Sequence, residues 1–379
     1  MQALKITDIE VVELRVPGWQ GLTFDGSYDN CVIRLRTDEG VTGTAEVDSV
    51  PSVIKAIIEA KPSHTHAMGL KTVLLGRDPS NVEALWDDMY DATSYYGRRG
   101  AVIHAISALD IALWDLRGKV QAKPLHALLG KTKRDRLLAY GTVYPLGETP
   151  DAVRKNIDRG LKLGLKAIKI VADPFWRDDL DHTAKLVRAA REHVGKDVRL
   201  MVDAATAWVK AEEGLPLMPL FKEHDFAWVE APLPLDDLAG HARFQGYGVP
   251  IGGGDLGLTT CAEYREMFDV GKIDIAQPDV TMVGGITELM RLAALARKLG
   301  KRVVTHGYKS NITIAANLAF LSQHDDDEPC EYSTSQSPLR WNLTTESFPI
   351  EPDGRIAIPK GPGLGVSLNE KTIAEFRIA

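Results

Sequence analysis

The stretch that decides the fold runs from RLMVD (199–203) through WVE (228–230) to IGGGD (251–255). Each of these short apolar runs ends in an acidic residue, and a charged, amphipathic segment follows it. The pattern extends in both directions and predicts strands at 138–144, 167–171, 199–203, 228–230, 251–255, 273–277, 303–305 and 330–332. Strands that alternate with helices form a parallel sheet, and eight is the strand number of a closed β/α barrel. Only the crossover between Pro232 and Pro250 has little helical sequence and must be compact.

The two ends of the chain have a different pattern of polar and apolar residues. Residues 6–15 and 31–36 alternate polar and apolar side chains, which predicts strands, whereas 53–58, 82–89 and 102–117 have helical spacing. We therefore expect an α+β domain over residues 1–130 and the barrel over 131–355. The last segment, 356–379, contains several Pro and Gly residues and is expected to be extended and to return to the first domain.

Composition excludes several classes of protein. The 379 residues carry a net charge of −7, with 44% hydrophobic and 26% charged residues, which are ordinary globular values. The mild acidity argues against a nucleic-acid partner but leaves an anionic substrate possible. Three cysteines without a CxxC spacing argue against a thiolate zinc site or a disulfide framework. Acidic residues near the N-terminus and the lack of a long apolar run predict a cytoplasmic protein with no membrane contact.

The strongest pattern lies where the strands end. Six polar residues follow one another there at intervals of 24 to 27 residues, namely Asp203, Glu230, Asp255, Asp279, His306 and Glu331. Any one of them could be a helix N-cap. Six consecutive strands with such an ending point instead to catalysis, because the carboxyl ends of barrel strands form the face that carries active sites.

The chemistry of these residues divides them into two groups. Asp203, Glu230 and Asp255 end three consecutive strands, and three converging carboxylates need a hard cation such as Mg²⁺, with Mn²⁺ as a substitute. Asp279 and His306 end the next two strands, where a carboxylate beside an imidazole makes a general acid and base. Lys169, on the second barrel strand, either faces this pair across the barrel mouth or extends to solvent.

Several strings carry a resemblance to a known family: RRGAVIHAISALDIALWDLRGK (98–119), PLHALLG (124–130), LMVDAATAW (200–208), WVEAP (228–232), DIAQPDVTMVGGITE (274–288), THG (305–307) and KGPGLGV (360–366). In these the chain resembles the enolase superfamily and, within it, the mandelate racemase subgroup. The resemblance implies a (β/α)₇β modified TIM barrel with an N-terminal α+β capping domain completed by the C-terminal segment. It also implies Mg²⁺ on Asp203, Glu230 and Asp255, proton transfer by His306 with Asp279, and a contact of Glu331 with substrate. Family members are commonly even-numbered homo-oligomers.

Three departures from the family pattern bear on the reaction. Where many members have a second lysine on the second barrel strand, this chain has Val171, and Ala205 replaces another possible base. Asp255 stands where the third ligand is usually glutamate. His306 is then the evident base, which favours β-elimination of water over racemisation, and L-rhamnonate dehydratases similarly lack that lysine. We therefore expect an acid-sugar dehydratase that converts an aldonate or aldarate to a 2-keto-3-deoxy acid.

Other assignments stay open at this point. Lys169 either contacts the substrate carboxylate or acts as a displaced second base in an epimerase or cycloisomerase. Lys309 either adds positive charge to the site or is a solvated loop residue. Trp19, in the loop 18–30 expected to close over the site, and Tyr96 either contact substrate or pack within the capping domain. The departures also leave a non-catalytic barrel as an alternative.

Overall fold

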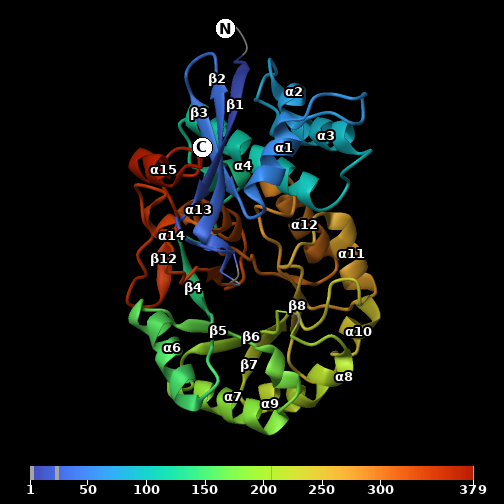
Figure 1. Ribbon diagram of the computed structural model, residues 1–379, viewed down its shortest axis with the longest axis vertical. Coiled ribbons are helices and arrows are strands. Elements are labelled where there is room, and N and C mark those ends of the chain that lie inside the picture. Colours follow the sequence, from blue (N-terminus) through green and yellow to red (C-terminus); the bar gives the residue numbers. More distant parts are fainter. Residues whose placement is uncertain (1–3, 22–24, 206, 379) are drawn as a thin grey trace.

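Figure 1 shows the computed structural model, which describes residues 4–21, 25–205 and 207–378. Its larger part is a parallel sheet of eight strands in the spatial order β10-β9-β8-β7-β6-β5-β4-β11. The strands are β4 (Arg136–Val143), β5 (Ala167–Val171), β6 (Arg199–Asp203), β7 (Phe226–Glu230), β8 (Ile251–Gly253), β9 (Ile275–Ala276), β10 (Arg302–Val303) and β11 (Cys330–Glu331). All eight predicted strands are present, although the last four are shorter than the sequence indicated.

Helices make the seven crossovers between these strands, so the fold is a (β/α)₇β barrel. They are α6 (Pro150–Lys162), α7 (Leu180–Val194), α8 (Ala211–Gly214) with α9 (Met218–Glu223), α10 (Leu238–Ala242), α11 (Cys261–Asp269), α12 (Gly285–Lys298) and α13 (Asn311–Leu321). The expected compact crossover is confirmed, because α10 has only five residues.

The interior of the barrel is built in two layers. An apolar floor takes one side chain from each of six segments, namely Tyr140, Ala167, Met201, Trp228, Ile275 and Val304. Side chains alternate between the two faces of a strand, so the residue two positions further along faces the same interior. The second layer consists of Thr142, Lys169, Asp203, Glu230, Gln277 and His306. The period of two therefore places the polar side chains directly above a sealed apolar floor.

The N-terminal part forms a cap over the barrel, seen at the top of Figure 1. It has an antiparallel sheet of β1 (Ile6–Arg15), β2 (Asp29–Thr37) and β3 (Thr42–Val47), followed by α1 (Pro51–Glu59), α2 (Leu70–Leu74), α3 (Val82–Thr93), α4 (Ala101–Val120) and α5 (Leu125–Leu129). Helix α4 is almost wholly buried and joins cap to barrel, since Asp110 accepts hydrogen bonds from the N–H and the hydroxyl of Thr287 on α12.

The C-terminal segment leaves the barrel and reaches the cap. After α14 (Pro338–Asn342), strand β12 (Arg355–Ala357) pairs antiparallel with β4, and Leu14 of β1 then forms a bridge with Arg377. The expectation that this segment is extended throughout is wrong, because its end forms helix α15 (Glu370–Phe376), whose Thr372, Ile373 and Phe376 are buried. Of the helices in the described part of the chain, none has the length and apolar character needed to cross a membrane.

Candidate active site

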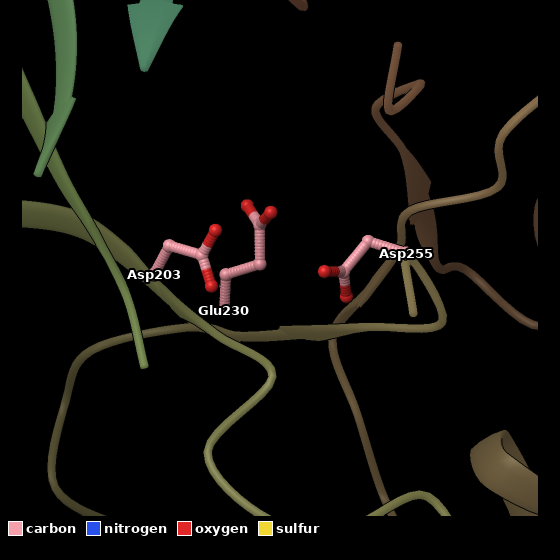
Figure 2. Close-up of side chains that lie close together, drawn as sticks. All are labelled: Asp203, Glu230 and Asp255. Atoms are coloured by element: carbon pink, nitrogen blue, oxygen red, sulfur yellow. The ribbon is translucent and has the colours of Figure 1, made fainter. Parts of the chain in front are cut away.

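Three buried carboxylates converge at the mouth of the barrel (Figure 2). Asp203 ends β6, Glu230 ends β7 and Asp255 follows β8, and one carboxylate oxygen from each lies within 4.8 Å of the others. Asp255 Oδ1 is buried and has no hydrogen-bond partner among the described residues. Such an unpartnered oxygen beside two other carboxylates is the donor set of a hard divalent cation, so these residues fit the metal that the sequence predicts.

Neighbouring groups hold the three carboxylates in place. Glu230 Oε2 accepts hydrogen bonds from Trp228 Nε1, at 3.0 Å, and from Gln277 Nε2. Gly252 leaves the room for this, since a Cβ there would overlap the Gln277 side chain. The peptide N–H of Ala205 donates to Asp203 Oδ1 at 2.8 Å, with Ala205 in the left-handed region at φ +46°. A non-glycine residue in that region is strained, and such strain is characteristic of functional sites.

Without a cation the ionised forms of Glu230 and Asp255 are disfavoured. Burial, and then the charges of Glu230 and Asp203, raise the pKa of Asp255 well above its ordinary value. Burial also raises the pKa of Glu230, although the Lys169 ammonium opposes this rise. A divalent cation would remove the penalty, because it offsets the mutual repulsion of the carboxylates.

Lys169 is buried among carboxylates and does not extend to solvent. Its Nζ donates to Glu230 Oε1 and lies 3.4 Å from Asp203 Oδ2 and 3.3 Å from Glu331 Oε1. Burial on its own would lower the pKa of Lys169, but Glu230 and Glu331 raise it well above the ordinary value. In this arrangement Lys169 is an ammonium that links Asp203 and Glu230 to Glu331.

His306 and Asp279 form the expected pair. Asp279 Oδ2 lies 2.8 Å from His306 Nδ1, while Asp279 Oδ1 accepts hydrogen bonds from the N–H and hydroxyl of Thr281. The bond at Nδ1 leaves Nε2 as the free ring nitrogen on the cavity side, 3.9 Å from Glu331 Oε2. Burial would lower the pKa of His306, but Glu331 and Asp279 raise it to about 10.

Glu331 lies between the two cationic groups. Its Oε1 accepts a hydrogen bond from the Thr142 hydroxyl, and its Oε2 accepts one from the Gly307 N–H at 2.9 Å. Burial would raise the pKa of Glu331, yet Lys169, His306 and the bond from Thr142 lower it to about 2. Glu331 is therefore a permanent negative charge that holds Lys169 on one side and His306 on the other.

A cavity of about 280 Å³ opens above these residues, and we call it the catalytic cavity. Its lining includes Lys169, Asp203, Asp255, His306 and Glu331, with Val171 two residues after Lys169 on β5. Sequence reasoning missed other lining residues, namely Asp25, Asp48, Thr142, Tyr144, Met282 and Tyr308. A period-two signal was available for Thr142 and Tyr144, which lie two and four residues after the floor residue Tyr140; Asp25, Asp48, Met282 and Tyr308 lie in loops that carry no such signal.

Three predicted substrate contacts lie outside the lining of this cavity. Lys309 is buried, and its Nζ donates to the carbonyls of Gly26 and Asp29 and lies 3.2 Å from Asp48 Oδ1. It is thus a tie between barrel and cap, neither a solvated residue nor a charge exposed to substrate. The Tyr96 hydroxyl donates to the Met68 carbonyl within the cap. Trp19 lines an adjoining cavity, and residues 22–24 of its loop lie outside the described part of the chain.

Comparison with known proteins agrees with this combination of fold and site. The family description "Enolase C-terminal domain-like" matches residues 152–372, and "Mandelate racemase / muconate lactonizing enzyme, N-terminal domain" matches residues 10–130. The chain therefore belongs to the enolase superfamily, in its mandelate racemase subgroup.

Individual relatives cover most of the chain. D-galactarolactone cycloisomerase of Agrobacterium fabrum is 30% identical over 360 residues, which are 92% of this chain and 91% of the relative. L-rhamnonate dehydratase of Saccharopolyspora erythraea is 35% identical over 308 residues, 78% of this chain and 74% of the relative. The crystal structure of the 3,6-anhydro-D-galactonate cycloisomerase from Zobellia galactanivorans has a TM-score of 0.86 at 27% identity and covers 99% of this chain and 100% of its own.

Proposed function

We propose that the protein is a Mg²⁺-dependent dehydratase of acid sugars that forms 2-keto-3-deoxy acids. The observation that carries this proposal is the asymmetry of the catalytic cavity. On one side the His306–Asp279 pair presents a free ring nitrogen, and on the second barrel strand Val171 occupies the position of a possible second base. Valine cannot accept a proton, so one group has to perform both proton transfers.

The proposed reaction begins with the substrate carboxylate beside Asp203, Glu230 and Asp255. When bound to these residues, Mg²⁺ would stabilise the negative charge that develops on the carboxylate as the α-carbon loses its proton. The neutral form of His306, which its raised pKa makes the minor form near pH 7, takes that proton at Nε2, while Asp279 holds the Nδ1–H and stabilises the imidazolium. Lys169 contributes a fixed positive charge beside the same carboxylate.

Elimination then completes the reaction. The electron pair of the broken C–H bond forms a carbon–carbon double bond, the bond from the β-carbon to its hydroxyl oxygen breaks, and the His306 imidazolium returns the proton to the departing oxygen as water. The resulting enol becomes the 2-keto acid when its β-carbon gains a proton and its enol oxygen loses one. Because one residue acts at both positions, the α-hydrogen and the β-hydroxyl have to leave from the same face of the substrate.

A cycloisomerase or epimerase is the second candidate, supported by the cycloisomerase relatives and by Lys169 on the second barrel strand. Incubation of an acid-sugar panel with Mg²⁺ in D₂O separates the two. A dehydratase forms a product that reacts with semicarbazide, whereas an epimerase exchanges the α-proton without one, and exchange alone across the panel would refute the proposal. A protein that shows no Mg²⁺-dependent stabilisation, and whose His306→Asn variant equals wild type, would instead be a non-catalytic family member.

A further inference from the structure

A second cavity of about 380 Å³ adjoins the catalytic cavity, and we call it the outer compartment. The two share Asp25, Tyr144 and Tyr308 as lining residues, so a molecule that begins in one can continue into the other. The outer compartment also has Arg159 of α6 in its lining. None of the catalytic groups described above lies in this lining, so its residues are available for binding the distant end of a substrate.

Arg159 has a charge that no carboxylate of the described residues balances. Its Nε donates to the Asn156 carbonyl at 3.4 Å and its Nη2 to the Tyr144 carbonyl at 3.2 Å, and no acidic side chain in the described ranges lies within ion-pair distance. A guanidinium has five N–H groups, so three remain after these two bonds. By contrast, Arg154 on the same helix forms an ion pair with Asp151 at 2.9 Å.

Asp25 is the acidic residue that shares this lining, and it is already engaged. Its Oδ1 accepts a hydrogen bond from the Ser27 N–H at 3.0 Å, and its Oδ2 accepts one from the Ser335 hydroxyl at 2.6 Å. These bonds hold Asp25 against the loop residues of cap and barrel, and it forms no ion pair with Arg159. The charge of Arg159 is therefore left for a ligand in the outer compartment.

Tyr308 shows that the two cavities are electrostatically close. Burial, and then the charge of Asp25, raise the pKa of Tyr308 to about 12, with Glu331 adding to the rise and Arg159 opposing it. The same phenol thus experiences Glu331 in the catalytic cavity and Arg159 in the outer compartment. A ligand that passes Tyr308 would have one end near each of these two charged residues.

We propose that the outer compartment binds a second carboxylate through Arg159, and that the preferred substrates are therefore aldarates, which are sugar diacids. This inference rests on the proposed function, because it assumes that the first carboxylate lies beside Asp203, Glu230 and Asp255. The guanidinium is the group of choice for the far end, since its planar fork pairs with both oxygens of a carboxylate. An aldonate, which ends in a neutral hydroxymethyl group, would leave the charge of Arg159 unpaired.

The test compares matched pairs of acid sugars that differ only at the far end, such as galactarate with galactonate and glucarate with gluconate, in the presence of Mg²⁺. Wild type is expected to have the higher kcat/KM for the diacid of the pair that it uses best. Arg159→Gln should lower the ratio of diacid to monoacid kcat/KM by about 10- to 100-fold. Arg159→Lys keeps a positive charge and should retain part of the preference, which a purely structural role of Arg159 would not explain. Arg154→Gln, on the same helix, is the matched control and should leave the ratio unchanged.

Calorimetry separates failure of this inference from failure of the proposed function. His306→Asn with Mg²⁺ should bind the diacid more tightly than the monoacid, and addition of Arg159→Gln should remove most of that difference. If no acid sugar is converted but the calorimetric difference appears and depends on Arg159, the proposed reaction is wrong and the outer compartment stands. A preference of wild type for monoacids, an unchanged ratio in Arg159→Gln, or no binding of either acid would overturn the assignment of Arg159.

Discussion

Asp279→Asn preserves the size of the side chain behind His306 and changes which of its atoms can accept hydrogen bonds. In the wild-type protein, Asp279 Oδ1 accepts from the Thr281 N–H at 2.6 Å and from its hydroxyl at 2.7 Å, and that hydroxyl in turn accepts from the Asp48 N–H. The amide oxygen of the variant has to remain with these two donors, because an NH₂ group there would face both of them. The NH₂ group then points at His306 Nδ1.

This orientation determines the tautomer of the imidazole. Nδ1 of His306 has to accept a hydrogen bond in the variant, so the neutral ring carries its proton on Nε2, the nitrogen that is free in the wild-type protein. A protonated Nε2 cannot take the α-proton of the substrate. General base catalysis contributes about 10²- to 10⁴-fold, and we expect kcat to fall by about that factor while Mg²⁺ binding persists.

The pH dependence distinguishes this explanation from a simple change of charge. The Asp279 carboxylate is one of the groups that raise the pKa of His306, so its removal should lower that pKa by roughly 1–3 units. If the charge alone mattered, more His306 would be neutral near pH 7 and the acidic limb of kcat/KM would move to lower pH with activity gained. If the tautomer matters, activity is lost although the ring is less protonated.

The assay follows keto-acid formation and α-proton exchange over pH 6–10, with ¹⁵N-labelled histidine reporting which ring nitrogen carries the proton. Asp110→Asn is the matched control, because Asp110 is also buried and also accepts hydrogen bonds from the N–H and hydroxyl of a threonine. Asp110 lies far from His306 in the sequence, at the junction of α4 and α12. Retention of kcat within threefold in Asp279→Asn, or an imidazole that keeps its proton on Nδ1, would refute the reasoning.

Three further predictions concern the metal, the pH dependence of stability and the junction of cap and barrel. Asp255→Asn relieves the repulsion among buried carboxylates, so the metal-free variant should melt no lower than metal-free wild type in calorimetry. The rise in Tm that Mg²⁺ causes in wild type should disappear in the variant. An undiminished rise would contradict the metal site. Burial raises the pKa of Asp110 from 3.8 to about 7, so the folded protein favours the protonated side chain. The contribution of Asp110 to the free energy of unfolding therefore falls as the pH rises from about 4 to 7, by at most about 4 kcal/mol. The stability of Asp110→Asn relative to wild type should therefore increase between pH 5 and pH 8 in denaturant titrations, and a constant difference would argue against the shift. Lys309→Met leaves Asp29 and Asp48 without their buried partner. This should lower the free energy of unfolding by about 3 kcal/mol and speed amide exchange at residues 25–29. Lys371→Met, on an exposed face of α15, is the control and should change neither stability nor exchange.

The barrel and its polar mouth could be predicted because both depend on short-range periodicity. Asp203 lies two residues after the buried Met201, and Glu230 lies two residues after Trp228. Once one apolar residue of a strand is known to face the barrel interior, the residue two positions later is expected to face it as well. The lengths of the last strands were less predictable. Strand β9 has two residues where five were expected. The chain after it does not continue the regular strand pairing, because it forms only an isolated β-bridge between Asp279 and His306.

The contacts between cap and barrel could not be predicted, because they join residues far apart in the sequence and have no period. Lys309 illustrates this, since its partners Gly26, Asp29 and Asp48 lie more than 250 residues away on the other domain. Glu46 is a second case. This fully buried carboxylate of β3 accepts hydrogen bonds from the Ser310 and Thr313 N–H groups at the start of α13. The sequence pattern around Lys309 or Glu46 does not indicate which domain the side chain will contact.

The charge of the mouth connects these observations to the order of binding. Among the described residues there, carboxylates outnumber cations, because Asp203, Glu230, Asp255 and Glu331, with Asp25 and Asp48 in the cavity lining, are opposed by Lys169 and His306. An anionic substrate would be repelled by this excess, as it would by the chain's net charge of −7. A divalent cation on the three carboxylates offsets the excess locally, and Arg159 adds a positive charge where the far end of a substrate would lie. Substrate affinity should therefore depend on prior occupation of the metal site, with acid sugars binding the metal-free protein weakly at every pH at which the carboxylates are ionised.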